Sequence, residues 1–222
     1  MGVLPESIKT IFQKNEFLSH YGYPRLDDTN NTTIKYLKLK PTDGRFFRGY
    51  IFDELLNHSE LPEISPELKK KITEAIYEVF INARIHSESE FIYTCGQIFP
   101  RKHQIEFTVT DTGIGFKNCI SKRFNKILSS TQALKWATMD DHTTKQGISG
   151  GIGLAILKEF VKKNKGKIQI ISDDGFYQMA DGQEWTREFS GAFPGTVVNM
   201  EFRTDDTSSY ALLDEITNDD II

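Results

Sequence analysis

The chain has 222 residues, of which 38% are hydrophobic and 26% charged, and its formal net charge is −4. This is the composition of a globular chain large enough for one sizeable domain, and it argues against intrinsic disorder. Nothing in the acidic balance indicates nucleic-acid binding, and no apolar stretch reaches the roughly 20 residues that a membrane span requires. We expect a cytoplasmic protein in which Cys95 and Cys119 are idle thiols.

Residues 1–65 are weakly patterned, and we expect them to form an N-terminal extension. Short helices are expected over Ser7–Asn15 and Tyr50–Asn57. The imperfect alternation of apolar residues over Thr33–Leu39 is typical of a strand. Leu61–Ser65 is a linker that ends where a helix is expected to begin.

The strongest predicted element is a helix from Pro66 to His86, which opens the main domain, residues 66–204. Ser65 is suited to cap this helix, and proline suits the first helical position. One apolar stripe at helical spacing supports the helix: Leu68, Ile72, Ala75, Ile76, Val79 and Ala83.

Four strands are expected after this helix: Phe91–Ile98, Gln104–Asp111, Lys167–Ser172 and Thr196–Arg203. A long, polar, irregular stretch over Thr112–Gly150, with a short helix near Thr131–Met139, comes before a second good helix over Gly153–Asn164. Tyr177–Phe189 is expected to form a hairpin between the last two strands, and residues 205–222 an acidic tail that frays.

The order of these elements predicts the fold class. Two neighbouring strands without an intervening helix argue against a purely parallel, doubly wound sheet. We therefore expect an α+β fold, a two-layer α/β sandwich whose mixed, mostly antiparallel sheet carries helices on one face.

The first candidate site residues lie on the long helix. Glu74, Glu78 and Asn82 are four residues apart, so they share one side of it. The amide oxygen of Asn82 can ligate Mg²⁺, which takes its other ligands from phosphates and water. The Glu78 carboxylate can accept a proton from a water molecule aimed at a phosphate. The alternative is an ordinary solvated side of a helix.

A second candidate is Asp111, which ends a strand on the same face as Phe107 and Val109. A carboxylate on a buried face needs hydrogen-bond donors, and the exocyclic amino group of adenine would supply them. Thr196 repeats this pattern at the start of the last strand and can join Asp111 directly or through water. The alternatives are a common Asp-Thr-Gly turn and a threonine bonded to nearby backbone.

A glycine-rich segment, Ser149–Leu154, precedes and opens the second helix. Backbone N–H groups at the start of a helix favour anions, phosphates above all. The P-loop spacing is absent, because no Gly-Lys-Ser/Thr follows. Lys145, just before these glycines, can reach a terminal phosphate; otherwise it is a solvated lysine and the glycines form a flexible loop.

Taken together, these motifs resemble those of the GHKL ATPase superfamily, which comprises gyrase-type ATPases, heat-shock chaperones, histidine kinases and MutL and has the Bergerat fold. The resemblance covers Pro66 to Arg203. The four motifs are Glu78–Ala83, similar to the N-box; Asp111–Gly115 and Gly151–Ile156, similar to the two glycine boxes; and Gly195–Thr196, similar to the closing Gly-Thr.

The resemblance implies an ATP and Mg²⁺ site in which Asn82 ligates the metal, Glu78 is the base and Asp111 binds the adenine amino group. Thr112–Gly150 would be the ATP lid, and His86 would touch the phosphates unless it is a solvated residue at the helix end. The remaining implied contacts to the nucleotide are Gly113, Gly115, Lys145, Gly150, Gly151, Gly153, Leu154 and Thr196.

Departures from sensor histidine kinases shape the functional hypothesis. Ile85 stands where those kinases often have lysine, Ser149 replaces a glycine, and neither His20 nor His58 lies in a phosphoacceptor context. We expect a nucleotide-gated regulatory ATPase that binds ATP or ADP and a protein partner, with a homodimer through the N-terminal segment as an open option. The alternatives are a protein kinase, of the anti-sigma serine type or of the histidine type with its acceptor on another chain, and a module that binds nucleotide without turnover.

Overall fold

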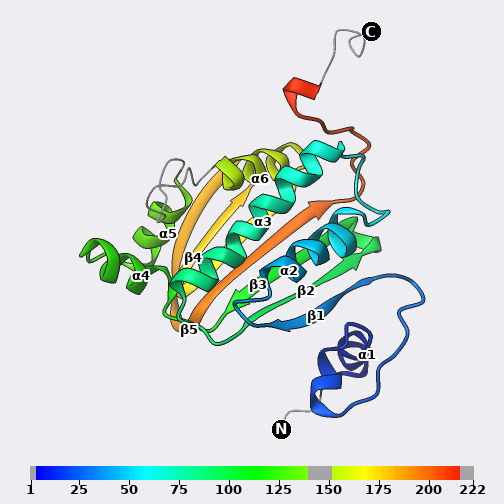
Figure 1. Ribbon diagram of the computed structural model, residues 1–222, viewed down its shortest axis with the longest axis horizontal. Helices are drawn as coiled ribbons and strands as arrows, with labels where there is room; N and C mark the ends of the chain where they lie inside the picture. The colour runs from blue at the N-terminus through cyan, green and yellow to red at the C-terminus, as the bar shows by residue number, and fades with distance from the viewer. Residues whose placement is uncertain (1–3, 140–151, 216–222) are drawn as a thin grey trace.

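The computed structural model describes residues 4–139 and 152–215, and Figure 1 shows its ribbon. Five strands form one sheet in the order β1-β2-β3-β5-β4. Their bounds are Thr33–Leu39 (β1), Ile92–Phe99 (β2), Gln104–Asp111 (β3), Lys167–Ala180 (β4) and Gln183–Arg203 (β5). The predicted α+β sandwich is confirmed.

All neighbouring strands of the sheet are antiparallel, so the expectation of a mixed sheet was wrong in this detail. The reason lies in the connections. Between β1 and β2, one helical segment carries the chain away from the end of β1 and a second helix brings it back to the same end (Figure 1). The next strand therefore runs in the opposite direction.

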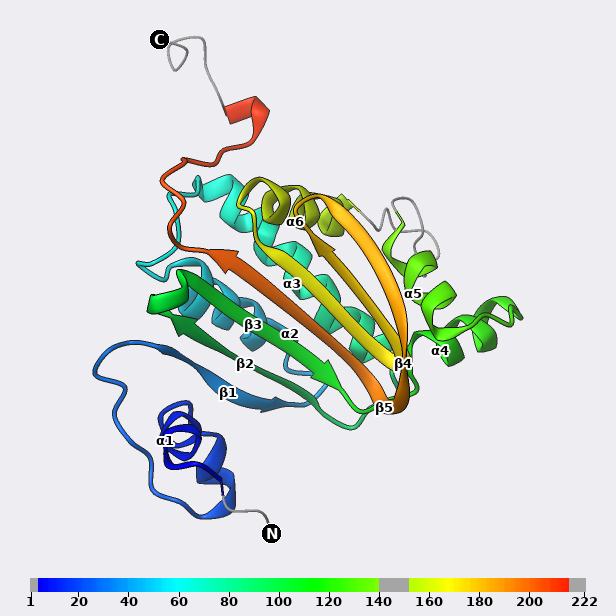
Figure 2. The ribbon, with the colours of Figure 1, turned by 180° about the vertical axis from the view of Figure 1, so that it is seen from behind.

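One face of the sheet is covered by helices, as Figure 1 shows, and Figure 2 shows the other face from behind. The covering elements are α2 (Gly44–Tyr50), the π-helix η2 (Ile51–Leu56), α3 (Pro66–His86) and α6 (Ile152–Lys163). On the opposite face, side chains form a polar row in which Thr108 Oγ1 donates to Asn199 Oδ1 over 2.7 Å and Asn199 Nδ2 donates to Gln169 Oε1 over 3.4 Å. The apolar core therefore lies between the sheet and this helical layer.

Helix α3 has the bounds and the cap that its sequence predicts. Ser65 Oγ accepts a hydrogen bond from the N–H of Leu68 at 3.2 Å, and Pro66 occupies the first helical position. Phe80, which the predicted stripe left out, is fully buried and stacks on Phe47 of α2 at 4.8 Å, whereas Val79 is only partly buried. The ring is the larger apolar group, so the helix turns it inward.

The N-terminal segment contributes to the same core through Ile34 of β1 and Phe47 of α2. α1 (Glu6–Lys14) and η1 (Phe17–Tyr21) lie against β1, where Phe17 meets Tyr36 edge to face at 5.0 Å. In place of the helix expected over Tyr50–Asn57, the chain forms α2 and then η2. The helical structure therefore begins at Gly44, six residues earlier than predicted. Strand β1 forms the edge of the sheet beside β2, so this segment completes the sandwich. A domain boundary at residue 65 stays a prediction.

Two helices lie at one end of the sandwich, α4 (Gly115–Phe124) and α5 (Ser130–Thr138). The expectation of a helix near Thr131–Met139 is confirmed, and a capping box between Ser129 and Gln132 begins it. The irregular structure expected over Thr112–Gly150 was wrong for α4. Its buried Cys119 and Ile120 and the partly buried Phe116 have helical spacing, a short signal among polar residues.

Strands β4 and β5 continue into the predicted hairpin and turn back sharply on themselves. Gln169 Nε2 donates to Gln178 Oε1 at 2.8 Å, although a straight strand would separate residues nine apart by about 30 Å. The pairing with β5 is irregular between Ser172 and Gly175, and Asp173 has a positive φ of 55°. The bend therefore lies at Asp173.

The C-terminal segment is ordered further than expected. Residues Asp205 to Glu215 were expected to fray, but Tyr210 packs edge to face on Phe160 at 5.1 Å. The backbone of Tyr210 also exchanges hydrogen bonds with Glu63 and Ser65, at 2.9 and 2.8 Å. Burial of one aromatic ring against the core explains this order.

Within the described ranges, no helix has both the length and the apolar character that crossing a bilayer would require.

Candidate functional site

Three polar residues form a row across neighbouring strands at one end of the sheet. Asp111 at the end of β3 pairs with Thr196 of β5, and Thr196 pairs with Ser172 of β4. Residues paired across antiparallel strands share a face. Val109 and Val198, two residues away from the row on their strands, are buried in the core. The row therefore faces the helical layer, as predicted for Asp111 and Thr196.

Asp111 is a buried carboxylate, with 4% of its surface exposed. Its Oδ1 accepts a hydrogen bond from the N–H of Gly113 at 2.8 Å. Burial raises the pKa of Asp111 from 3.8 to about 6, although hydrogen bonds from the backbone of Gly113 and Thr196 oppose the rise. Among the described residues, no basic side chain pairs with this carboxylate. It retains lone pairs for a donor from outside the chain.

The loop after Asp111 is bonded to the end of α3. The N–H of Ile114 donates to the carbonyl of Ser87 at 2.8 Å, and the hydroxyls of Ser89 and Thr112 lie 3.3 Å apart. Asn82 precedes Ser87 by five residues, about 7 Å of helical rise. The buried acid and the helix that carries the candidate amide thus meet at the same end of the molecule.

Glu78 and Asn82 are half-buried on α3. His86 belongs to the same helix, and Gly153 and Leu154 belong to the first turn of α6. The predicted contacts Lys145, Gly150 and Gly151 lie outside the described residues. The structure thus describes parts of all four motifs.

The glycines beside Asp111 have packing roles. A Cβ on Gly113 would lie 1.9 Å from the carbonyl oxygen of Ser87, and one on Gly195 would lie 2.2 Å from that of Asp111. Gly115 and Gly195 also have positive φ angles of 71° and 116°. These positions admit only glycine because the loop, α3 and β5 approach one another so closely.

A comparison with protein families identifies the chain. A sequence model of the histidine kinase-, DNA gyrase B- and HSP90-like ATPases matches residues 67–204. The chain belongs to this family. Among curated proteins, no sequence matches it. The chain therefore carries an ATP-binding module of the GHKL type, and this agrees with the resemblance drawn from the four motifs.

The residues of this ATPase module fit an adenine nucleotide. Asp111 offers acceptor oxygens in a buried position, as an exocyclic amino group requires. In the part of the chain that the structure describes, no three His, Cys, Asp or Glu side chains gather to hold a metal ion.

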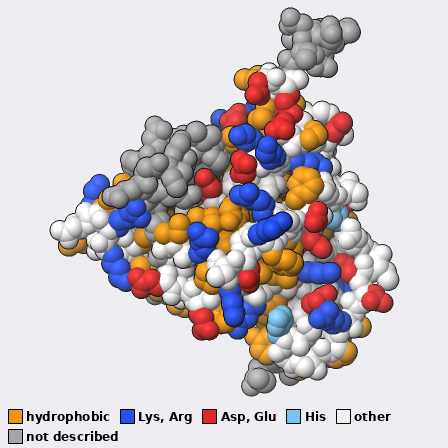
Figure 3. Space-filling view, in the orientation of Figure 1, with side chains coloured by type: hydrophobic (Ala, Val, Ile, Leu, Met, Phe, Trp, Pro, Cys, Tyr) orange, Lys and Arg blue, Asp and Glu red, His pale blue; other side chains and the backbone are white. Residues whose placement is uncertain are grey.

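The ATPase module also has a basic end that sequence reasoning missed. The 25 residues from Gly115 to Met139 include five basic residues and no acidic one, in a chain of net charge −4. They are Lys117, Lys122, Arg123, Lys126 and Lys135. Figure 3 shows Lys and Arg side chains over α4 at the left edge of the molecule. Lys117 and Lys122 form ion pairs with Asp173 and Glu88, and the basic excess that remains favours the approach of an anionic nucleotide.

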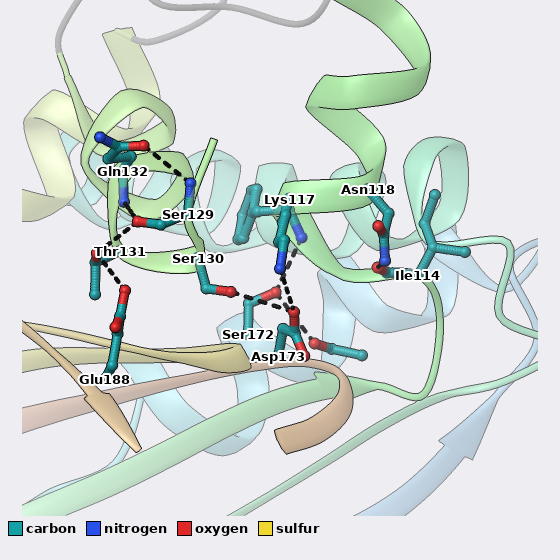
Figure 4. Close-up of polar contacts among 12 residues, drawn as sticks. Ile114, Lys117, Asn118, Ser129, Ser130, Thr131, Gln132, Ser172, Asp173 and Glu188 are labelled. Atoms are coloured by element: carbon teal, nitrogen blue, oxygen red, sulfur yellow. Dashed lines mark hydrogen bonds and ion pairs between the residues drawn. The ribbon is translucent and has the colours of Figure 1, made fainter. Parts of the chain in front are cut away.

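Sequence reasoning also missed Ser172 and Asp173, which Figure 4 shows beside the N-terminal starts of α4 and α5. Ser172 Oγ accepts a hydrogen bond from the N–H of Phe116 at 2.9 Å, and Asp173 Oδ2 accepts one from Ser130 Oγ at 3.2 Å. Their contacts depend on strand register and on a bend. No local sequence pattern reveals such contacts.

Proposed function

We propose that this chain binds ATP with Mg²⁺, hydrolyses it slowly and acts as a nucleotide-gated regulatory module toward a protein partner. The observation that carries the proposal is the environment of Asp111. Its carboxylate is buried, its pKa is raised to about 6, and the described residues supply it with backbone donors but no cation. An adenine amino group is the donor that this environment lacks.

The remaining roles follow from the positions of the side chains on α3. Asn82 would ligate Mg²⁺ through its amide oxygen. Glu78, one turn earlier on the same side, would accept the proton of the attacking water. Bound ATP supplies the phosphoanhydride bond that this water cleaves. Thr196, opposite Asp111, would hold the adenine edge directly or through water.

Titration calorimetry with ATP tests the adenine assignment. Asp111→Asn is expected to abolish ATP binding, because the amide nitrogen opposes a ligand donor. The matched control is Glu106→Gln, the same change on the opposite face of β3, where Glu106 pairs with Gln104 at 2.8 Å. Unaltered binding by Asp111→Asn, or equal loss in both variants, would refute the assignment.

Incubation with γ-labelled ATP and cell lysate separates hydrolysis from its alternatives. Release of labelled phosphate without a labelled protein supports the regulatory ATPase. A labelled protein supports a kinase of the serine or histidine type. Binding without either product supports a module that does not turn over. The presence of Glu78 favours the first two outcomes, because binding alone needs no base at that position.

A further inference from the structure

Ser172 lies between Thr196 of the proposed adenine site and the start of α4. It is fully buried at the end of the row that begins at Asp111. Its hydroxyl donates to the carbonyl of Gly195 at 3.2 Å and accepts from the N–H of Phe116 at 2.9 Å. A third contact, of 3.3 Å, joins it to the hydroxyl of Thr196.

A serine hydroxyl has one proton to donate. When the proton of Ser172 is donated to the carbonyl of Gly195, the hydroxyl of Thr196 is the donor at the contact between the two side chains. The position of the Thr196 hydroxyl is therefore tied to the same oxygen that receives the Phe116 N–H at the start of α4.

The next residue holds both lid helices, α4 and α5. Asp173 Oδ2 lies 3.5 Å from Lys117 Nζ of α4 and 3.2 Å from Ser130 Oγ of α5 (Figure 4). Asp173 is also where β4 bends, with φ of 55°. A Cβ on Gly175 would lie 2.8 Å from Ser130 Cβ, so α5 packs directly on this bend. A displacement of β4 here would move the starts of both helices.

We propose that Ser172 and Asp173 are positioning residues that couple occupancy of the adenine site to the order of α4 and α5. Ser172 joins Thr196 to the start of α4, and Asp173 extends the link to α5. The inference rests on the proposed function, since it requires a nucleotide beside Asp111 and Thr196. It adds the route by which the nucleotide acts on the lid helices.

Hydrogen exchange of the full chain, with and without saturating ATP and Mg²⁺, tests this route. In the wild type, ATP is expected to slow amide exchange at the starts of α4 and α5. In Ser172→Ala, ATP is expected to bind at most about tenfold more weakly, and the ATP-dependent slowing in both helices should disappear at saturation. Retention of that slowing by Ser172→Ala would overturn the proposal.

The control is Thr131→Ala, which removes another hydroxyl of α5. This hydroxyl lies 2.9 Å from Ser129 Oγ and 3.3 Å from Glu188 Oε1, and it contacts neither Ser172 nor Asp173. The variant is expected to keep the full response to ATP. Asp173→Ala decides the matter if Ser172→Ala does not fold, because Asp173 is partly exposed. It should bind ATP as the wild type does, yet lose the slowing at the start of α5; a normal α5 response would contradict the proposal.

The wild type alone separates this inference from the proposed function. If calorimetry detects no ATP binding, both fail. If ATP binds and exchange at the starts of α4 and α5 does not change, the proposed function stands and only the coupling through Ser172 and Asp173 is refuted.

Discussion

The carbonyl of Ser87, the residue after α3, accepts a hydrogen bond from the N–H of Ile114 at 2.8 Å. This bond joins the helix of the proposed catalytic residues to the loop that follows the adenine-binding acid. Gly113 lies at the contact and leaves no room for a side chain. The distance between the two halves of the site therefore depends on one glycine.

Gly113→Ala is expected to lower the free energy of unfolding by about 1–3 kcal/mol, because its Cβ would lie 1.9 Å from the Ser87 oxygen and force the backbone apart. ATP affinity should fall with it. Urea denaturation and calorimetry measure the two effects. The control is Gly49→Ala in α2, where a Cβ would meet nothing within 4 Å. Equal stability of the two variants would contradict the close contact.

The buried Asp111 predicts a dependence of stability on pH. Its folded-state pKa of about 6 is above the ordinary 3.8, so the folded protein holds this proton more tightly than the unfolded chain. Its contribution to stability is therefore fully present below about pH 3.8 and is lost as pH rises through about 6.

Asp111→Asn stays neutral at every pH and should escape this loss. Without nucleotide, we expect it to be more stable than the wild type at pH 7, by up to about 3 kcal/mol. The difference should shrink toward pH 4. Urea denaturation at several pH values gives the comparison. A difference that stays the same from pH 4 to pH 7 would contradict the raised pKa.

Glu78→Gln is expected to bind ATP like the wild type and to lose phosphate release by a factor of about 10²–10⁴, the usual contribution of a general base. The matched control is Glu74→Gln, one turn earlier on the same helix and also half-buried. Calorimetry and a phosphate-release assay separate binding from turnover. Equal turnover in both variants would remove Glu78 from the proposed chemistry.

Removal of residues 1–65 is expected to prevent folding, although the family match begins only at residue 67. The shortened chain would lack β1 and the buried Phe47, Ile51 and Leu55, and it would expose the edge of β2. Removal of residues 1–32 alone keeps β1 and should leave a folded protein of lower stability. Circular dichroism and gel filtration distinguish these outcomes, and a monomeric, cooperatively folding 66–222 fragment would contradict the expectation.

Local patterns predicted the elements whose causes are local. The cap at Ser65 and the apolar stripe set the bounds of α3, and the alternation around Phe107 set those of β3. The burial of Asp111, which made it a candidate site residue, could be predicted because its strand placed it on the inward face. In contrast, α4 has a short apolar stripe among polar residues. The predicted stripe of α3 included Val79, which is partly buried, and omitted Phe80, which is fully buried.

Contacts between residues far apart in the sequence could not be predicted from local patterns. The role of Ser172 follows from its pairing with Thr196, 24 residues later, and from a bond to Phe116, 56 residues earlier. The order of the C-terminal segment depends on Tyr210 meeting Phe160 and the linker at Glu63. Periodicity carries no information about such pairs. The antiparallel direction of β2 relative to β1 likewise follows from how α2 and α3 return the chain.

The polar row on the uncovered face of the sheet limits where another protein can bind. Thr108, Asn199, Gln169 and Gln178 already satisfy one another there. A protein that packed on this surface would remove water from these polar side chains without providing stronger hydrogen bonds in exchange. Recognition that changes with nucleotide is therefore expected on the helical side, beside the basic residues of α4 and α5.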